Sequence, residues 1–482
     1  MAAAAGLAPK ISAAEKQKPP NVILILGDDH RWDALGCMGN KIIQTPHLDQ
    51  LARDGVIFDN HFATTPICWT SRASIMLGQY ARTHGIFDVF LPLTPAQIQQ
   101  TYWMKMKQAG YHIGFIGKYG VGMATKNSPD ADPHNLPGSA FDYWKGFWGQ
   151  GNYFPEGMNG PHLTYIMRDQ ANEFLNAVPS DKPFCLSMSF KSPHIQDDDP
   201  RQYLPSNDTL SLYEDITIPL FEGAEVGDIA RFPLAIQRSE NRRRWAITFS
   251  TPELYQASMK GYYRLISGMD RAIGSIRETL AKRGLADNTV IVFSADHGIF
   301  NGEHGLAGKW YGHEEAIRIP LIIHDPRMPA NARGSRRQAM TLNIDLQPTL
   351  LELAGIAPPE STQGRSLVPS LRAEAPESRA LWFFEHYINV QNERFPWIPS
   401  SEGIRTRRWK YIRYTDDAAP YEELYDLEAD RHETRNLAGQ AHYATQQQAL
   451  IACWQKWRES FKTNEGSWIE PIKGEDLSRA GL

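Results

Sequence analysis

The stretch Val22-Ile23-Leu24-Ile25-Leu26 is followed at once by Gly27-Asp28-Asp29. Five consecutive apolar side chains suit a strand that is buried on both faces of a parallel sheet. The two carboxylates therefore lie at the carboxyl end of the predicted strand. In open parallel sheets, ligands bind beyond the carboxyl ends of the strands. The stretch predicts an α/β fold with a polar site at this strand end.

Three further segments repeat this arrangement. Residues 111–116 precede Gly117-Lys118, and residues 184–190 precede Lys191-Ser192-Pro193-His194. The β-branched run 289–294 precedes Asp296 and His297. Each reads as a buried strand that ends in polar, charged or metal-liganding residues. We expect the four strand ends to converge on one site.

A long helix is predicted between the third and fourth strands. Gly284 lies just past its end as a stop signal. The spacing indicates a crossover helix that feeds a parallel strand, and its apolar stripe is interpreted as core packing. The stripe consists of Tyr262, Leu265, Ile266, Met269, Ile273, Ile276 and Leu280.

Composition limits the function classes. The 482 residues are 42% hydrophobic, enough for one large α/β core and a smaller appendage. A net charge of -5 argues against a nucleic-acid binder, and the basic runs 242–244 and 405–410 are interpreted as solvated or strand-edge charge. The four cysteines are too few and too scattered for a disulfide scaffold or a zinc ribbon.

The chain divides into three predicted parts. Residues 1–19 read as a disordered leader or the remnant of a signal peptide, and 20–375 as the catalytic domain. The boundary is placed where Pro, Ser and Glu become frequent after a probable helix at 345–354. Residues 376–482 are predicted to form a small subdomain. No apolar run approaches the roughly 20 residues that span a bilayer, so we expect a soluble protein without a membrane span.

The C-terminal subdomain is predicted to be an antiparallel sheet with a covering helix. Residues 403–414 alternate as a strand does, and a charged turn leads to a second strand at 423–427. A final helix is expected at about 441–461.

The segment Cys68-Trp69-Thr70-Ser71-Arg72 indicates which reaction the residues at these strand ends could support. Together with the segments above, it resembles the formylglycine-dependent (type I) sulfatases of the alkaline-phosphatase-like superfamily, over residues 21–437. The resemblance implies a large mixed, mostly parallel sheet sandwiched by helices, and a small antiparallel α+β subdomain after it. Further matching positions are Thr45 to Asp49, Leu77-Gly78, Ala295 to Gly298, Lys309 and residues 405–436.

The resemblance also implies the reaction. A formylglycine-generating or equivalent maturation enzyme oxidises Cys68 to formylglycine, whose hydrated aldehyde presents two hydroxyls. One hydroxyl attacks the sulfur of a sulfate ester beside a divalent cation and the alcohol leaves; the other hydroxyl then expels sulfate and restores the aldehyde. The implied ligands of this cation are Asp28, Asp29, Asp296, His297 and the oxygen of residue 68. Because oxygen ligands select hard cations, Ca²⁺ is the first choice and Mg²⁺ the second.

Four cationic side chains complete the implied catalytic set. Arg72 is expected on the first turn of the helix after Cys68, where it anchors formylglycine. Lys118 is carried over as a ligand of the sulfate oxygens, and Lys309 as a bridge between sulfate and the leaving oxygen. His194 is carried over as the proton donor to the leaving alcohol. Lys118, His194 and Lys309 are thus both catalytic and substrate-binding residues.

The chain departs from the family pattern at two positions. Thr70 stands where the family has Pro or Ala, which leaves the type of maturation enzyme open. Gly120 stands where the family has a histidine that assists sulfate release. His297 and His61 are the candidate substitutes for that histidine.

A sulfated saccharide is the predicted substrate, because the stretch from Glu385 through Tyr411 resembles glycan-acting members of the family. The insertion 195–249, with its acidic run 197–199 and arginine run 242–244, and the aromatic segment 383–397 either line the pocket or fill the interdomain seam. Periplasmic or secreted location is the corresponding expectation, and the oligomeric state stays open.

Three alternatives remain at this stage. A phosphonate monoester or phosphodiester hydrolase of the same superfamily would keep Cys68, Asp28 and Asp296. A two-zinc phosphatase would need a Ser or Thr nucleophile, against which the Cys68 segment argues. An unmodified Cys68 would leave a non-catalytic protein that binds sulfated glycans.

Overall fold

The computed structural model describes residues 18–87, 89–122, 136–224, 228–372, 374, 379–387, 398–415, 421–463, 471–472 and 477. The predicted leader 1–19 lies almost entirely outside these residues. The predicted boundary at 375/376 lies outside them as well, so the division into domains stays a prediction.

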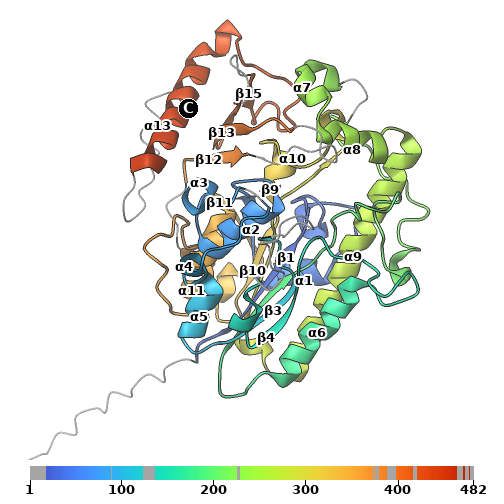
Figure 1. Ribbon diagram of the computed structural model, residues 1–482, viewed down its shortest axis with the longest axis vertical. Coiled ribbons are helices and arrows are strands. Elements are labelled where there is room, and N and C mark those ends of the chain that lie inside the picture. The colour runs from blue at the N-terminus through green and yellow to red at the C-terminus, as the bar shows by residue number, and fades with distance from the viewer. Residues whose placement is uncertain are drawn as a thin grey trace, which may run out of the picture.

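A nine-stranded mixed sheet forms the centre of the molecule (Figure 1). Strand β1 lies in the middle and pairs in parallel with β5 and β6, and β3 continues the parallel part beyond β5. Along the sheet the order is β11 (Ser335–Leu342), β2 (Val56–Phe62), β10 (Leu321–His324), β6 (Thr289–Ala295), β1 (Asn21–Gly27), β5 (Phe184–Ser189), β3 (His112–Lys118) and β4 (Tyr143–Phe147), with β9 (Arg318–Ile319) paired to β2.

All four predicted strands are confirmed, as β1, β3, β5 and β6. Because they are parallel, their carboxyl ends lie along one edge of the sheet. Asp28 follows β1, Lys118 ends β3, and Asp296 follows β6. Strands β2, β10 and β11 were not predicted, and β10 runs antiparallel to both of its neighbours.

Helices cover both faces of the sheet, as Figure 1 shows. Side chains of β1 alternate between the two cores: Val22, Leu24 and Leu26 pack on one face, and Ile23 and Ile25 on the other. The first core is completed by α2 (Cys68–Leu77), α5 (Tyr102–Gln108) and α11 (Leu346–Leu353). The second core is completed by α1 (Pro46–Asp54), α6 (Leu163–Ala177) and α9 (Pro252–Lys282).

Helix α9 confirms the predicted crossover between β5 and β6. It begins at Pro252, where the side chain of Thr251 accepts a hydrogen bond from the Leu254 amide at 3.3 Å. Gly284, just past its end, has φ of 66°. Every residue of the predicted stripe is buried, so the periodicity reports core packing as expected.

A second, four-stranded antiparallel sheet lies at the C-terminal end and is covered by α13 (Ala444–Thr463). The predicted single strand at 403–414 is wrong, because the chain turns at residues 407–408 and forms a hairpin. The strands are β12 (Leu381–His386), β13 (Ser401–Thr406), β14 (Trp409–Tyr414) and β15 (Glu422–Asp426).

Two basic side chains of this hairpin correct the prediction of solvated or strand-edge charge. Arg405 and Lys410 are 5% and 0% exposed. Both form ion pairs with Glu314 of the first part of the chain, at 3.0 and 2.9 Å, and Lys410 also pairs with Glu433 at 2.6 Å. Buried charges are tolerated only when they are paired, so these contacts hold the second sheet against α10 (Glu314–Ile317).

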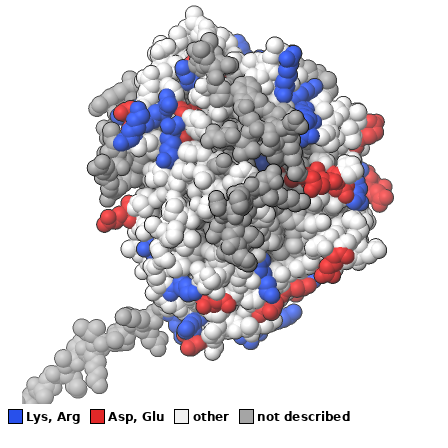
Figure 2. Space-filling view, in the orientation of Figure 1, with Lys and Arg blue, Asp and Glu red and all other residues white. Residues whose placement is uncertain are grey.

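The visible face in Figure 2 carries acidic and basic side chains in small interspersed groups among the described residues. Over that same part of the chain, the helices lack the combination of length and apolar character that a membrane crossing requires.

Candidate active site

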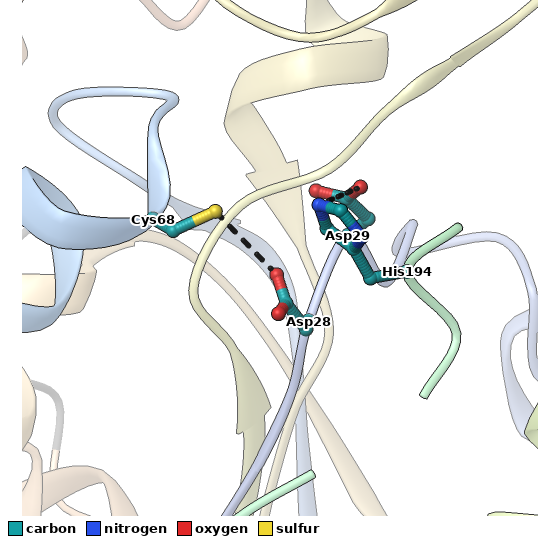
Figure 3. Close-up of side chains that lie close together, drawn as sticks. All are labelled: Asp28, Asp29, Cys68 and His194. Carbon is teal, nitrogen blue, oxygen red and sulfur yellow. Dashed lines mark hydrogen bonds and ion pairs between the residues drawn. The ribbon is translucent and has the colours of Figure 1, made fainter. Parts of the chain in front are cut away.

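Side chains from distant parts of the chain meet at the carboxyl edge of the main sheet. Cys68 is the first residue of α2, and its Sγ lies 3.6 Å from Oδ1 of Asp28, which follows β1 (Figure 3). The loop after β5 brings His194 to the neighbouring carboxylate, with Nε2 3.6 Å from Oδ2 of Asp29. The strand ends therefore converge, and Cys68 lies among them at 2% exposure.

Five predicted ligands form a cluster that fits a divalent cation. One ligand atom from each of Asp28, Cys68, Asp296 and His297 lies within 4.8 Å of the others, and Asp29 belongs to an overlapping group with Asp28, Cys68 and His194. Three buried carboxylates so close together repel one another unless positive charge is present. Carboxylate oxygens are the donors that Ca²⁺ and Mg²⁺ prefer, so the residues present fit such an ion.

The electrostatics of the cluster differ from one carboxylate to the next. Burial alone would raise the pKa of Asp28, but Lys118, His194 and Arg72 hold it well below its usual value. At Asp29 burial prevails and raises the pKa, although Lys309 and His297 oppose it.

Lys118 and Lys309 contact the cluster from segments that are far apart in the chain. Lys118 Nζ lies 2.5 Å from Oδ2 of Asp28, and Lys309 Nζ lies 2.7 Å from Oδ1 of Asp29. Lys309 Nζ is also 3.2 Å from Sγ of Cys68. Burial would lower both lysine pKa values, but the carboxylates raise them, so both side chains stay cationic.

Arg72 corrects one expectation, because it lies on the second turn of α2, four residues after Cys68. From there its Nε donates to Oδ2 of Asp296 at 3.1 Å, and its Nη1 donates to the carbonyl oxygen of Lys118 at 2.8 Å. The guanidinium therefore joins the ends of β6 and β3, and it is 1% exposed.

Backbone contacts fix the orientation of His194. Its Nδ1 donates to the carbonyl oxygen of Ile195 at 2.7 Å, which turns Nε2 toward Asp29. Lys191 Nζ donates to the same carbonyl at 2.9 Å and lies 5.0 Å from the ring centre of Tyr153. Burial and the charge of Lys118 lower the pKa of Lys191 to about 8.

Gly120 is incompatible with a side chain in the present arrangement. Its φ is 75°, and a Cβ at this position would lie 2.6 Å from Cδ of Arg72. His297 Nε2 lies 3.3 Å from Sγ of Cys68, whereas His61 is turned away and its Nδ1 pairs with the Thr341 hydroxyl at 2.9 Å. Of the two candidate substitutes for the family histidine, only His297 is therefore in contact with Cys68 in the described part of the chain.

Two residues that support the site were not predicted from the sequence. Gln150, in the turn after β4, accepts from Lys118 Nζ at 2.6 Å. Asn241, in α8 (Glu240–Thr248), donates to the carbonyl oxygen of Lys309 at 2.7 Å. Neither residue follows a motif, so only the tertiary structure identifies them.

The aromatic segment 383–397 is described up to residue 387. In this described part, Phe383 and Phe384 pack in the core beneath the second sheet.

Two family models match the chain. The model described as Sulfatase covers residues 20–356, and one described as N-sulphoglucosamine sulphohydrolase, C-terminal, covers residues 302–460. The first match spans more than half of the chain and includes every residue of the cluster described above.

Similar proteins are found among curated sequences and solved structures. An N-acetylglucosamine-6-O-sulfatase of Bacteroides thetaiotaomicron is 30% identical over 95% of this chain and 89% of its own. An arylsulfatase of Clostridium perfringens is 27% identical over 88% and 91%. A structure in complex with its substrate D-glucosamine-2-N,6-O-disulfate is 27% identical over 93% of this chain and 99% of its own, with a TM-score of 0.79. The chain therefore belongs to the sulfatase family of the alkaline-phosphatase-like superfamily, and it is a sulfuric ester hydrolase.

Proposed function

We propose that the protein hydrolyses a sulfate ester of a saccharide by means of a formylglycine made from Cys68. The observation that carries this proposal is the contact of Cys68 Sγ with Asp28, Lys309 and His297, at 3.6, 3.2 and 3.3 Å. A buried residue surrounded by carboxylates, ammonium groups and an imidazole suits an oxygen nucleophile that attacks a charged ester.

The modified residue and the cation would supply the chemistry that unmodified side chains lack. Formylglycine, once formed and hydrated, would offer one hydroxyl that attacks sulfur while the alcohol leaves, and a second whose proton loss re-forms the aldehyde and expels sulfate. Asp28, Asp29, Asp296 and His297 would hold the cation, with calcium the first choice, and its charge would favour the deprotonated form of a hydroxyl.

The remaining residues bind and orient the substrate. The ammonium groups of Lys118 and Lys309 offset the charge of the sulfate oxygens. Arg72 holds the ends of β6 and β3 at fixed positions, because its fork contacts both. His194 presents Nε2 toward the leaving oxygen, and the carbonyl of Ile195 keeps its Nδ1 protonated.

The saccharide assignment is supported by the named relatives, which include an N-acetylglucosamine-6-O-sulfatase and an ulvan-active sulfatase of Formosa agariphila. Sulfated polysaccharides are found outside the cytoplasm, and we therefore propose a periplasmic or secreted location.

Mass spectrometry of the peptide that holds Cys68, combined with turnover of an aryl sulfate, tests the proposal. We expect a loss of about 18 Da relative to the thiol, and turnover in proportion to the modified fraction. The Cys68→Ala variant is the control and should be inactive. Full turnover by protein with an intact thiol, or faster cleavage of a phenylphosphonate ester than of any sulfate ester, would contradict the proposal.

A further inference from the structure

One arginine of the run 242–244 lies against the residues on either side of Lys309 rather than in solvent. The side chain of Arg244, in α8, is only 12% exposed, and its guanidinium carbon lies 5.2 Å from the ring centre of Trp310. Trp310 directly follows Lys309. A Cβ on Gly308 would come within 3.3 Å of the Arg244 side chain, so Arg244 packs directly on the segment that carries Lys309.

Arg244 also reaches the loop that carries His194. Its Nη2 lies 3.4 Å from Oδ1 of Asp197, which is three residues after His194 and has a side chain that is 26% exposed. The Arg244–Asp197 pair therefore connects the segment of Lys309 with that of His194. In the proposed function, Lys309 binds the sulfate group and His194 faces the leaving oxygen.

The pair has unused hydrogen-bonding capacity. Arg244 Nε donates to Oε1 of the buried Glu240 at 2.8 Å, which fixes the guanidinium in place. Among the described residues, Nη1 of Arg244 and Oδ2 of Asp197 have no hydrogen-bond partner. A guanidinium carries five N–H donors and a carboxylate accepts about four hydrogen bonds, so both can bind a ligand without losing their present contacts.

We propose that Arg244 and Asp197 bind hydroxyl groups of the sugar ring that carries the sulfate ester. This inference rests on the proposed function. The pair contacts the two segments that carry His194 and Lys309, so we expect a group attached to the leaving oxygen between these side chains to extend toward it. A sugar hydroxyl both donates and accepts, so it satisfies the arginine and the carboxylate together. An aryl group satisfies neither, and a second anionic substituent would be repelled by Asp197.

Substrates with and without hydroxyl groups separate this role from a structural one. The variants Arg244→Gln and Asp197→Asn are assayed with N-acetylglucosamine 6-sulfate, with a panel of other monosaccharide sulfates, and with an aryl sulfate. We expect kcat/KM for the best saccharide to fall by roughly tenfold to 100-fold, mainly through KM, because hydrogen bonds to charged groups are lost. Turnover of the aryl sulfate should stay within about twofold.

Arg243→Gln is the matched control, because Arg243 pairs with the same Glu240 but its side chain is 47% exposed. This variant should leave both substrates unaffected. An equal fall for sugar and aryl sulfate in Arg244→Gln would show that Arg244 merely supports Lys309 and would overturn the inference, as would an unchanged saccharide rate. Wild-type turnover of the aryl sulfate alone would overturn the inference and leave the sulfatase chemistry intact. Protein with verified formylglycine that cleaves neither substrate would instead refute the proposed function.

Discussion

Restoring the family histidine at Gly120 should damage the protein rather than improve it. Two separate costs apply. An L-residue in the left-handed region, here with φ of 75°, costs about 1–2 kcal/mol. A Cβ at 2.6 Å from Cδ of Arg72 adds the cost of overpacking, about 1–3 kcal/mol. Relief of the contact moves Arg72, so the distance of 3.1 Å between its Nε and Asp296 is lost.

The variants Gly120→Ala and Gly120→His separate these costs when they are compared with Gly110→Ala. Gly110 has φ of 91° and nothing within 4 Å of a built Cβ, so its substitution reports the backbone cost alone. In urea unfolding, Gly110→Ala should lose about 1–2 kcal/mol, and Gly120→Ala about 2–5 kcal/mol. The kcat/KM for an aryl sulfate should fall by about 100-fold in Gly120→Ala and Gly120→His but not in Gly110→Ala, because a small displacement of Arg72 disturbs the site.

The refuting results are specific. Gly120→His could instead retain wild-type stability and hydrolyse the sulfate ester faster. That result would show that Arg72 can move without cost and that the absence of a histidine at position 120 lowers the activity of this protein. Equal destabilisation by Gly110→Ala and Gly120→Ala would show that the contact with Arg72 relaxes without cost.

Three further outcomes are expected. Arg72→Lys should lower kcat/KM for an aryl sulfate by about 100-fold, because an ammonium cannot replace the fork between Asp296 and the Lys118 carbonyl; an activity near wild type would contradict this. Calcium at 100 times its Kd should raise the free energy of unfolding by about 2.7 kcal/mol, and a chelator should reverse it; an unchanged Tm would argue against the ion. Burial lowers the pKa of Lys191 to about 8, so above that pH the unfolded chain binds more protons than the folded one. Wild-type stability should therefore rise relative to Lys191→Met between about pH 8 and pH 10, and a constant difference in urea unfolding would refute the burial effect.

The strands that carry the site could be predicted because each is a continuous apolar run with chemistry at its end. Periodicity also located α9, whose 31 residues give a long signal. Strands β2 and β11, at the other end of the sheet, were not predicted. β2 contains Asp59, Asn60 and His61, and β11 contains two arginines, so neither strand has a clear apolar pattern.

The residues of the site also fall into two groups, those that a local sequence pattern predicts and those that it does not. Asp28, Cys68, Lys118, His194, Asp296, His297 and Lys309 lie in motifs of fixed order, and the structure brings them together. Gln150, Asn241 and Arg244 contact residues that lie 32, 68 and 66 positions away in the chain, and no local sequence pattern predicts such contacts. The burial of Lys410 was not predicted for a similar reason, because its charge is balanced by Glu314 and Glu433, which lie 96 and 23 positions away in the chain.

The enclosure of Cys68 sets an order of events in biosynthesis. Its thiol is 2% exposed, and the groups that cover it include Asp296, His297 and Lys309, which the ribosome makes more than 200 residues later. If Cys68 is oxidised as proposed, the maturation enzyme has to reach the thiol before these groups enclose it, which happens when β6 joins the sheet beside β1. Coexpression should therefore yield the aldehyde, whereas the same enzyme added to the finished protein should leave the thiol unchanged until the chain is unfolded.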